Sequence, residues 1–554
     1  MASSSARTSP QADSNPGKRR ILPMHPDHNW QDLIWYEAPR EDPAFPEVYV
    51  YTDQMSYLPG EQICIHASST ASRWDLEIYR DGAQPLRVHG VTDLPGVFTP
   101  TPKEAYRVGC NWPISHRWRL AADTPSGFYR IKASCSRPDG TSFVQHHFFV
   151  VRPTKQTRKG PLLHVLPTAT WTAYNDWGGA NHYAGIDGQT QDQPSPCLSL
   201  QRPWTRGLVW LPENAPRFCT PVQQPNTPPR YEAKEWAYAH GFGFFYASSG
   251  WAQYDRHFAV WAELEGYAFD TITQTDLHYH PEILSDYRCV VIVGHDEYWT
   301  REMRLAIEEF VLQGGNLARL GANFSWQIRL EDQGARQICY KTRACLEDPV
   351  RETDNRHLLT TAWEDRAINW PGTSTVGVNG LSGVYASWGG FMARGTRGFT
   401  VYRPDHWAFE ATDLAYGDVF GAEARIFGYE VDGVDYTFRE GLPYPTGNDG
   451  AALDIEILAM SPAVHAEGDY FGTSFRPYIG HRDQHENALL VFGEVTPDTL
   501  AKSRYGSGMM VCMQRGRGEV LTAASTDWVM GLKRGCTYTQ QITRNILNRF
   551  ISQG

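Results

Sequence analysis

The sequence has no long run of charge of one sign and no long apolar segment. Its 554 residues include 51 basic and 62 acidic side chains, and neither sign gathers into a stretch that would follow a phosphate backbone. No window offers the roughly 18 uncharged apolar residues that a membrane-spanning helix needs. These absences exclude nucleic acid and membrane from the expected partners.

The N-terminal stretch "MASSSARTSPQADSNPGKRRI" lacks the apolar core of a secretion signal, and we expect a flexible, disordered tail over residues 1–25. The ten cysteines stand singly, without a CxxC pair or zinc-finger spacing. This pattern predicts buried free thiols in a cytoplasmic protein.

Motifs of several enzyme classes are also absent. The chain has no GxSxG, Walker loop, GxGxxG or HExxH, which argues against serine hydrolases, nucleotide-binding proteins and zinc proteases. What it does have is 19 Trp, 28 Tyr and 24 Phe, with many glycines and prolines, and this composition indicates a sheet-rich, loop-rich protein with large aromatic burial. The length favours two large units, so we expect an α+β multidomain protein.

Residues 26–154 are predicted to form an immunoglobulin-like β-sandwich. The segments "EQICIHASS", "WDLEIYRDG", "SGFYRIKASC" and "FVQHHFFVV" have strand-like patterns with turn residues between them. About seven short strands in roughly 100 residues, with no good helix between them, suit an antiparallel sandwich of this type. The basic connector "RPTKQTRKG" marks the expected domain boundary.

Residues 155–554 are predicted to form an α/β domain with a β-rich insertion. The apolar strands "PLLHVLP", "YAFDTITQTDL" and "RCVVIVG" lie between segments of helical spacing. In "TREMRLAIEEFVLQGG" the apolar residues fall on one helical face, Thr300 can cap the start and the glycines can end the helix. Residues 375–530 indicate strands and loops, "NALLVFG" among them, and "TQQITRNILNRFI" indicates a last helix that packs back on the sheet.

The segment "GHDEYWT" gathers polar side chains where a buried strand ends. Open parallel sheets bind ligands at the carboxyl ends of their strands. His295, Glu297 and Tyr298 follow one such strand, and Asn323 ends the next. Cys289 lies at the other end of the strand, which argues against thiol catalysis. The sequence therefore predicts a site at this edge of the sheet.

Several motifs occur in an order that resembles a known family. They include "YLPGEQICIHAS", "TWTAYNDWGGANHYAG", "GHDEYWTREMRLAIEEFVLQGGNLARLGANFSWQIRLE", "RPDHWAFEATDLAYGDVFG" and "STDWVMGL". From about residue 45 onward the chain is similar to the large-subunit family of N,N-dimethylformamidase. The resemblance implies an immunoglobulin-like domain followed by a glutamine-amidotransferase-like α/β domain. It also implies hydrolysis of a formamide to formate and an amine at one ferric iron, held by two tyrosinates and a glutamate.

The resemblance also implies where the iron ligands lie. Tyr298 is the first expected ligand, because it follows the histidine and glutamate of the strand-end segment. Tyr254, in "WAQYDRHFAVWAELEGY", is the expected second ligand. The chain departs from the family's pattern in the region of the carboxylate, which we place on Glu331. Tyr267 and Tyr287 are the alternatives for the second tyrosine. Glu364 is the alternative for the carboxylate.

These residue types suit a mononuclear Fe(III) site. Phenolate and carboxylate are hard oxygen donors, and a phenol loses its proton readily beside a strong cation. His295 is the expected base because imidazole titrates near neutral pH, Asn323 is expected to donate to the developing oxyanion, and Glu297 is the third expected catalytic residue. Each also has a structural alternative: a packed tyrosine, a loop-bonded histidine or an asparagine in a turn. Supporting polar groups are expected at Glu430 and His406.

Two functions from different classes are open at this point. The first is an iron-dependent amidohydrolase for a small N-substituted amide, expected as a homo-oligomer that accommodates a small accessory subunit. The second is a non-catalytic module that binds carbohydrate or protein, because aromatic-rich loops such as "TWTAYNDWGGANHYAG" also suit sugar stacking. The pocket-lining side chains that decide the size of an amide substrate are not located by the sequence.

Overall fold

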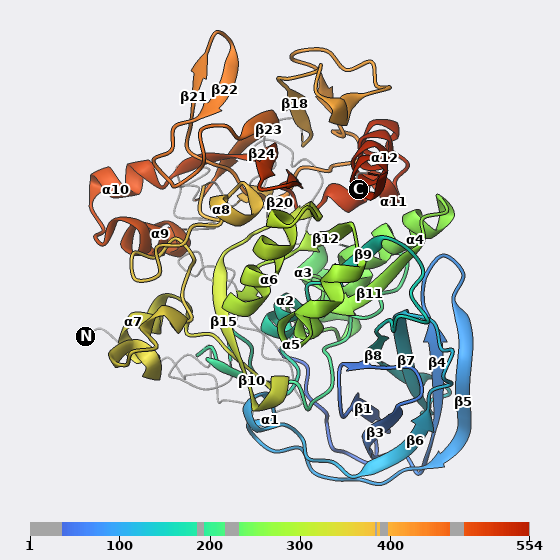
Figure 1. Cartoon of the computed structure of the whole chain (residues 1–554). Coiled ribbons are helices and arrows are strands. Elements are labelled where there is room, and N and C mark those ends of the chain that lie inside the picture. Colours follow the sequence, from blue (N-terminus) through green and yellow to red (C-terminus); the bar gives the residue numbers. More distant parts are fainter. Residues whose placement is uncertain are drawn as a thin grey trace, which may run out of the picture.

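The computed structural model describes residues 36–185, 193–216, 232–382, 385–387, 397–465 and 481–552. The tail expected over residues 1–25 lies outside these ranges. A β-sandwich forms the N-terminal part of the described chain, and a larger α/β unit around one long sheet follows it (Figure 1). The basic connector lies between the last sandwich strand and the first strand of the long sheet, where the sequence predicts a domain boundary.

The sandwich consists of two sheets that share one apolar core. Within the described residues the sheet orders are β1-β3-β6 and β2-β8-β7-β4-β5. Neighbouring strands are antiparallel, apart from the parallel pair β2 and β8. Leu76 and Ile78 of β4 belong to the same buried cluster as Ile63 and Ile65 of β3 in the opposite sheet. The bounds are β1 Val48–Thr52, β2 Ser56–Tyr57, β3 Gln62–Ser69, β4 Arg73–Arg80, β5 Leu86–Pro95, β6 Ile114–Arg119, β7 Gly127–Ser136 and β8 Ser142–Val151.

A short helix, α1 (Ala105–Val108), interrupts the strands, which the sequence analysis did not expect. It lies between β5 and β6, and Tyr106 packs with Leu198 of the α/β unit. Glu, Ala and Arg in this stretch are good helix formers, and tertiary packing supports the single turn. The two-sheet arrangement agrees with the predicted sandwich, whereas its immunoglobulin-like topology stays a prediction.

The α/β unit is built on a sheet whose first half is parallel. β11, β9, β12, β14 and β25 lie side by side and parallel. β24 pairs antiparallel with β25, and β23 and shorter strands continue from it. Several strands of the predicted β-rich insertion thus extend this sheet. The bounds are β9 Leu162–Leu166, β11 Phe269–Thr273, β12 Cys289–His295, β14 Asn316–Ala322, β17 Tyr385–Ser387, β18 Phe399–Val401, β19 Val419–Phe420, β20 Tyr429–Glu430, β23 Glu456–Val464, β24 Tyr505–Arg515 and β25 Gly518–Ala523.

Helices cover both faces of the parallel strands. On one face, Val291 and Val293 of β12 share a buried cluster with apolar residues of α4 (Arg256–Leu264), α11 (Trp528–Lys533) and α12 (Thr537–Ser552). On the other face, Val290 and Ile292 pack with residues of α5 (Gln274–Tyr279) and α6 (Arg301–Leu312). The predicted helix capped by Thr300 is confirmed, since its hydroxyl accepts the Met303 N–H, and so is the last helix on the sheet. The glutamine-amidotransferase-like assignment of this layered unit stays a prediction.

One predicted strand is wrong: "NALLVFG" belongs to a helix, α9 (His481–Phe492). Ala488 and Leu490 of this segment are buried, while Leu489 is 50% exposed. A short apolar run does not by itself distinguish a strand from a helix, and the polar residues before it extend the helix. The remaining helices and strands are α2 Thr168–Tyr174, α3 Glu232–His240, α7 Ala344–Glu347, α8 Thr373–Val376, α10 Pro497–Lys502, β10 Cys197–Ser199, β13 Tyr298–Thr300, β15 Trp326–Glu331, β16 Arg336–Ile338, β21 Tyr436–Arg439 and β22 Leu442–Pro445.

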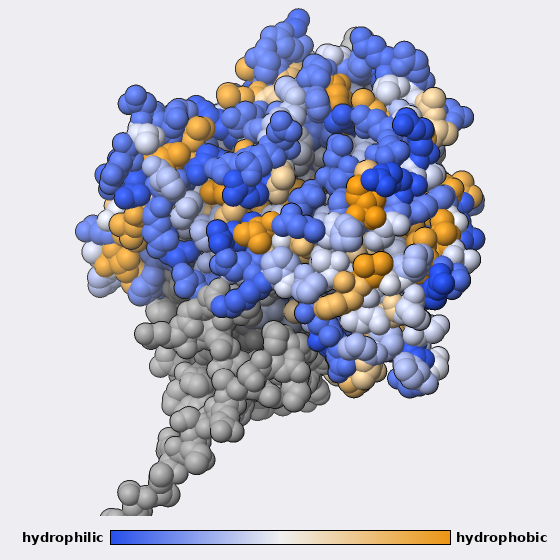
Figure 2. All heavy atoms as spheres, turned by 90° about the horizontal axis from the view of Figure 1, so that it is seen from below, coloured by the Kyte–Doolittle hydropathy of each residue, from blue (hydrophilic) through white to orange (hydrophobic). Residues whose placement is uncertain are grey.

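The surface agrees with a chain that buries its apolar side chains. On the face shown in Figure 2, apolar residues form small separate patches between hydrophilic ones. Within the described ranges, no helix is both long and apolar enough to cross a membrane. The nine cysteines in these ranges are free thiols, as the sequence predicts, but not all of them are buried: Cys345 is exposed, and Cys64, Cys197 and Cys536 are half-buried. Cys219 lies outside the described ranges.

Candidate active site

Two parallel strands end at the same edge and bring their polar residues together. β12 ends at His295 and β14 at Ala322, and these two residues lie opposite each other in the register. Gly294 has a φ of +73°, and a Cβ there would lie 2.3 Å from the Cβ of Tyr254. Glycine is needed at this position, because its missing side chain lets the helical turn of Tyr254 approach the strand end.

A buried ion network holds the two strand ends in place. Arg319 of β14 donates to Asp296 Oδ2 at 3.0 Å and to Asp432 Oδ2 at 2.8 Å. Asp432 in turn accepts the backbone N–H of Asn323 at 2.7 Å. All three charged side chains are fully buried. The network therefore holds Asn323 in a left-handed conformation, with a φ of 70°, directly after the strand.

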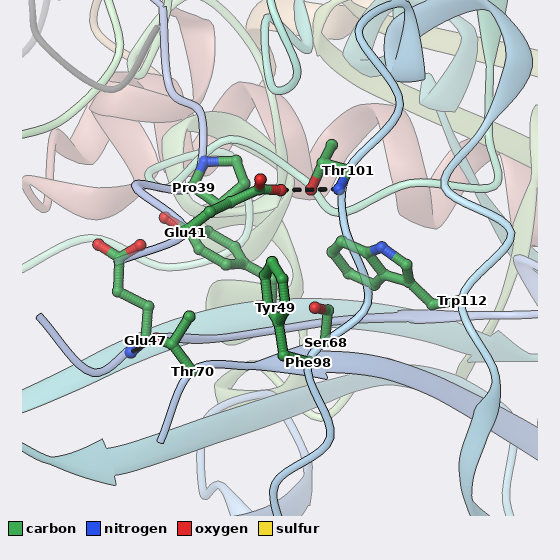
Figure 3. Close-up of a pocket in the computed structure, with 9 residues that line it drawn as sticks. All are labelled: Pro39, Glu41, Glu47, Tyr49, Ser68, Thr70, Phe98, Thr101 and Trp112. Carbon is green, nitrogen blue, oxygen red and sulfur yellow. Dashed lines mark hydrogen bonds between the residues drawn. The ribbon is translucent and has the colours of Figure 1, made fainter. Parts of the chain in front are cut away.

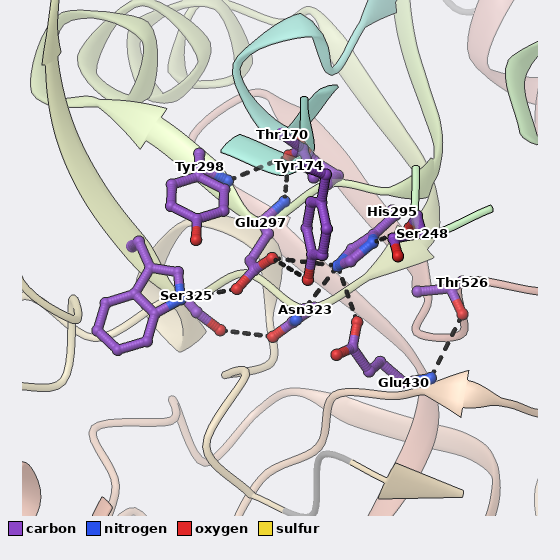
Figure 4. Close-up of polar contacts among 12 residues, drawn as sticks. Thr170, Tyr174, Ser248, His295, Glu297, Tyr298, Asn323, Ser325, Glu430 and Thr526 are labelled. Atoms are coloured by element: carbon purple, nitrogen blue, oxygen red, sulfur yellow. Dashed lines mark hydrogen bonds and ion pairs between the residues drawn. The ribbon is translucent and has the colours of Figure 1, made fainter. Parts of the chain in front are cut away.

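His295 lies between two carboxylates at the centre of the cluster (Figure 4). Its Nδ1 donates to the backbone oxygen of Ser248 at 2.8 Å. Its Nε2 lies 3.2 Å from Glu297 Oε2, 2.8 Å from Glu430 Oε2 and 3.3 Å from the Asn323 Nδ2. Burial alone lowers the pKa of His295, but Glu430 and Glu297 outweigh this effect and raise the pKa to about 10. The imidazole is therefore protonated at neutral pH.

The carboxylate of Glu297 accepts hydrogen bonds from side chains of two other segments. Tyr174 donates to Oε2 at 3.1 Å, Tyr183 to Oε1 at 2.6 Å and the indole of Trp326 to Oε1 at 2.7 Å. Tyr298 donates its hydroxyl to that of Tyr183 at 2.7 Å. Three phenol oxygens and one carboxylate thus form a single connected network.

The two glutamates of the cluster respond differently to burial. Burial raises the pKa of Glu297, but its contacts with His295 outweigh this effect, so the pKa lies below its ordinary value. Burial also raises the pKa of Glu430, and His295 offsets only part of that increase. Glu297 therefore has the stronger tendency to stay ionised, and Glu430, whose Oε2 lies 2.8 Å from His295 Nε2, is the carboxyl better suited to exchange a proton with it.

The phenols are held neutral by their surroundings. Burial raises the pKa of Tyr174, Tyr183 and Tyr298 well above the ordinary value, and the charge of Glu297 adds to the effect. The ammonium of Lys341 lies 3.6 Å from the ring centroid of Tyr183, which brings a second cation to this side of the cluster. Ionisation of a phenol here requires a stronger cation close to its oxygen.

One known protein family matches most of the chain. Residues 70–540 match the family described as N,N-dimethylformamidase beta subunit-like, C-terminal. The chain belongs to this family. The resemblance that the motifs indicate is thereby confirmed, and membership in the dimethylformamidase-like family supports a hydrolase that acts on amides.

Other comparisons add little to this assignment. No curated protein gives a significant match. Among solved structures, the sporulation control protein Spo0M of Bacillus subtilis is 15% identical over 20% of this chain and 51% of its own, with a TM-score of 0.15. Murine CRIg is 11% identical over 20% of this chain and 99% of its own, with a TM-score of 0.14. The soluble domain of PmoD from Methylocystis sp. is 10% identical over 19% of this chain and 90% of its own, with a TM-score of 0.13. Scores this low carry no argument about fold or function.

In this dimethylformamidase-like chain the structure brings four of the predicted site residues together: His295, Glu297, Tyr298 and Asn323. Tyr298 does not simply follow β12: it begins a further strand, β13, which pairs with β15. Glu430, expected only as a supporting group, touches His295 directly.

The other predicted ligands lie at the border of the cluster or outside it. Tyr254 lies in a π-helical turn, Trp251–Asp255, with its ring centroid 6.4 Å from that of His295. Glu331 ends β15, and its side chain is 42% exposed and 3.7 Å from Arg329. Since Tyr298 lies beside the first residue of that strand, Glu331 is on the order of 15 Å further along. The remaining candidates contact other regions: Glu364 binds Gly372, Tyr267 binds Asn548, Tyr287 binds Asp270 and His406 approaches Glu456.

Sequence reasoning missed Tyr174 and Tyr183 as members of the site. Both lie in "TWTAYNDWGGANHYAG", which the sequence analysis treats as a family motif without giving these tyrosines a role. The segment follows β9, which is the parallel neighbour of β12, and Thr170 of α2 accepts the backbone N–H of Glu297 at 2.9 Å. The strand-end rule, applied to this third strand as well, would have indicated them.

Oxygen donors dominate the cluster, and this bears on the kind of metal that would fit. In the part of the chain that the structure describes, no group of three or more His, Cys, Asp or Glu has the arrangement of a metal site. A metal in the cluster would therefore need phenol oxygens as ligands. Glu297 with the hydroxyls of Tyr174 and Tyr183 supplies the hard anionic donors that suit ferric iron, so the donor chemistry fits.

A hollow on the sandwich lies apart from this cluster (Figure 3). It includes Glu41, which accepts the backbone N–H of Thr101 at 2.7 Å, together with Phe98 and Trp112. None of the clustered histidine, tyrosine and carboxylate groups described above lines it. We therefore place the candidate active site at the strand ends.

Proposed function

We propose that the chain hydrolyses the C–N bond of a small N-substituted amide at a mononuclear ferric site. Glu297, Tyr174 and Tyr183 would hold the iron. This set replaces the Tyr254, Tyr298 and Glu331 expected from the family's motif. The observation that carries the proposal is the meeting of the Tyr174 and Tyr183 hydroxyls on the Glu297 carboxylate, which itself lies 3.2 Å from His295.

Bound ferric iron would supply Lewis acidity, which polarises the amide carbonyl and acidifies water. The proton transfers fall to the protein. Glu430, with its raised pKa, is the group suited to take the proton of the attacking water. The imidazolium of His295 can protonate the departing amine through Nε2, and Glu430, 2.8 Å away, then returns its proton to that nitrogen. The Ser248 carbonyl keeps Nδ1 engaged, so Nε2 is the nitrogen that exchanges the proton.

Asn323 is suited to stabilise the charge that develops on the carbonyl oxygen. Its Oδ1 accepts the Ser325 hydroxyl at 2.6 Å, which leaves Nδ2 directed toward His295. The backbone hydrogen bond to Asp432 holds this amide in place before the reaction. A preorganised donor of this kind typically contributes several kcal/mol to transition-state stabilisation, about 3–4 when one is removed.

Burial of the aromatic segment favours the hydrolase over a carbohydrate- or protein-binding module. Trp171 and Trp177 are 1% and 0% exposed, and Tyr174 points to Glu297. A sugar-stacking surface requires exposed ring faces, which these side chains do not offer.

The test is metal and amine analysis of the purified chain. We expect near-stoichiometric iron, a visible phenolate-to-iron band and amine release from at least one member of a panel of formamides and larger N-alkyl amides. Tyr174→Phe should lose the band and most of the iron, whereas Tyr267→Phe, a half-buried control whose hydroxyl binds Asn548, should keep both. Iron-loaded protein that hydrolyses no amide would overturn the proposal. Light scattering on the same sample tests the expected oligomer.

A further inference from the structure

Two histidines meet at the open edge of the β-sandwich, far in sequence from the proposed catalytic cluster. His89 lies on β5 and His116 on β6, which are the edge strands of the two different sheets. The register places His89 opposite Ile78 of β4 and His116 opposite Ile65 of β3. The histidine pair therefore joins one sheet to the other at the same edge of the sandwich.

The two imidazoles are arranged with their Nε2 atoms together. These nitrogens are 2.9 Å apart, and the ring centroids are 5.1 Å apart with an interplanar angle of 23°. The ring of Trp118, two residues after His116, stacks on His89 at 4.8 Å and 11°, which fixes the orientation of that imidazole. Both histidines are half-buried, so their nitrogens are within reach of solvent ions.

The charge state of the pair suits metal binding. Burial lowers the pKa of His89, with a further contribution from the positive charges nearby, and burial lowers that of His116. Neutral imidazoles carry a lone pair on one ring nitrogen, and this lone pair is the donor that a metal ion requires. The nearby Arg87 lies 3.4 Å from the carboxylate of Glu77, which partly balances its charge.

The spacing of the nitrogens is close to what a shared cation needs. Two nitrogens bound to one tetrahedral zinc at about 2.0–2.1 Å are roughly 3.3 Å apart. The rings would therefore have to separate by only a few tenths of an ångström from their present contact of 2.9 Å. We infer that His89 and His116 form a two-histidine site for a borderline divalent cation such as Zn²⁺, Ni²⁺ or Cu²⁺, with water in the other coordination positions.

Such a site would clip the two sheets together at their open edge. In the described residues no further His, Cys, Asp or Glu joins the pair to make a three-ligand metal group, so imidazole nitrogen alone sets the preference. Nitrogen ligands favour Cu²⁺, Ni²⁺ and Zn²⁺ over Mg²⁺ and Ca²⁺. A cation that binds only the folded sandwich also raises its melting temperature by mass action.

Equilibrium dialysis of the full chain against Zn²⁺ tests the inference. His89→Gln and His116→Gln should each lose one bound equivalent, or weaken it by at least about ten-fold, relative to the parent chain. His280→Gln is the matched control: the His280 side chain is 42% exposed and forms an ion pair with Glu282, so this variant removes a histidine that lies outside the proposed site. Zinc held at the proposed catalytic cluster is common to all these proteins and cancels in the comparison. Equal zinc binding by the parent and both glutamine variants would overturn the site.

A second measurement needs no mutation. Acylation of histidines by diethyl pyrocarbonate, followed by mass spectrometry, should modify His89 and His116 in metal-free protein and spare them when Zn²⁺ is present. The extent of modification at His280 should be the same in both samples. Modification of the pair that Zn²⁺ leaves unchanged would contradict the inference, even if the glutamine variants failed to fold.

Discussion

Replacement of Arg319 by methionine should cost this protein much of its stability. Arg319 is fully buried and donates to the side chains of both Asp296 and Asp432 and, at 3.1 Å, to the Asp296 backbone oxygen. Methionine keeps much of the volume of the side chain but leaves two buried carboxylates without a cation. Removal of one partner from a buried pair costs about 3–5 kcal/mol, and one arginine here serves two partners, so we expect the upper part of that range.

Urea unfolding followed by tryptophan fluorescence measures this loss. The control is Arg336→Met, because the Arg336 side chain is 41% exposed in its pair with Asp332, and such a pair contributes at most about 1 kcal/mol. If the penalty arises from uncompensated charge, the triple change Asp296→Asn, Arg319→Met and Asp432→Asn should recover a large part of the lost stability. An Arg319→Met protein within about 1 kcal/mol of the parent, or a triple variant no better than the single one, would refute the reasoning.

Three further predictions concern the strand end, the proton path and the sandwich. Gly294→Ala places a Cβ 2.3 Å from that of Tyr254 at a φ of +73°, so the free energy of unfolding in urea should fall by about 2–5 kcal/mol. An unchanged urea midpoint would contradict this prediction. Glu430→Gln removes one of the two carboxylates that raise the pKa of His295, so turnover of the iron-loaded protein should fall by about 100-fold or more at unchanged iron content. Parent-like turnover would exclude Glu430 from the proton path. Burial lowers the pKa of His147 to about 3, so the unfolded chain, with a value near 6.5, takes up the proton first as pH falls. The contribution of His147 to the free energy of unfolding is fully present above about pH 6.5 and should decrease by about 2 kcal/mol at pH 5. His147→Gln should reduce this pH dependence, and a variant whose unfolding free energy changes with pH just as that of the parent does would disprove it.

The part of the site on β12 and β14 can be predicted from the sequence. A buried apolar run followed by a capped amphipathic helix defines a strand and its carboxyl end, and the next strand begins soon after the helix. Parallel strands then place His295 and Asn323 at one edge, where their side-chain nitrogens are 3.3 Å apart. Local patterns suffice here because the two strands are neighbours both in sequence and in the sheet.

The rest of the site depends on contacts between segments that are distant in the sequence. Tyr174 and Tyr183 follow β9, whose position beside β12 is a fact of sheet order that no local pattern states. Glu430 comes from β20, at the far end of the strand order in the same sheet. Glu331 ends β15, which belongs to a separate small sheet and carries the carboxylate away from the cluster.

The charge balance of the cluster is the physical reason for a metal in the proposed function. Glu297 and Glu430 are buried beside one imidazolium, so the three groups carry a net negative charge whenever both carboxylates are ionised. The pKa values of the phenols of Tyr174 and Tyr183 are raised by burial and by Glu297, so neither phenol ionises at neutral pH on its own. A trivalent cation at the meeting point of these oxygens would lower the pKa values of the two phenols, because it stabilises phenolate more than it stabilises phenol. The arrangement that makes the phenols poor acids in the free chain thus makes the same oxygens, once ionised, good ligands for ferric iron.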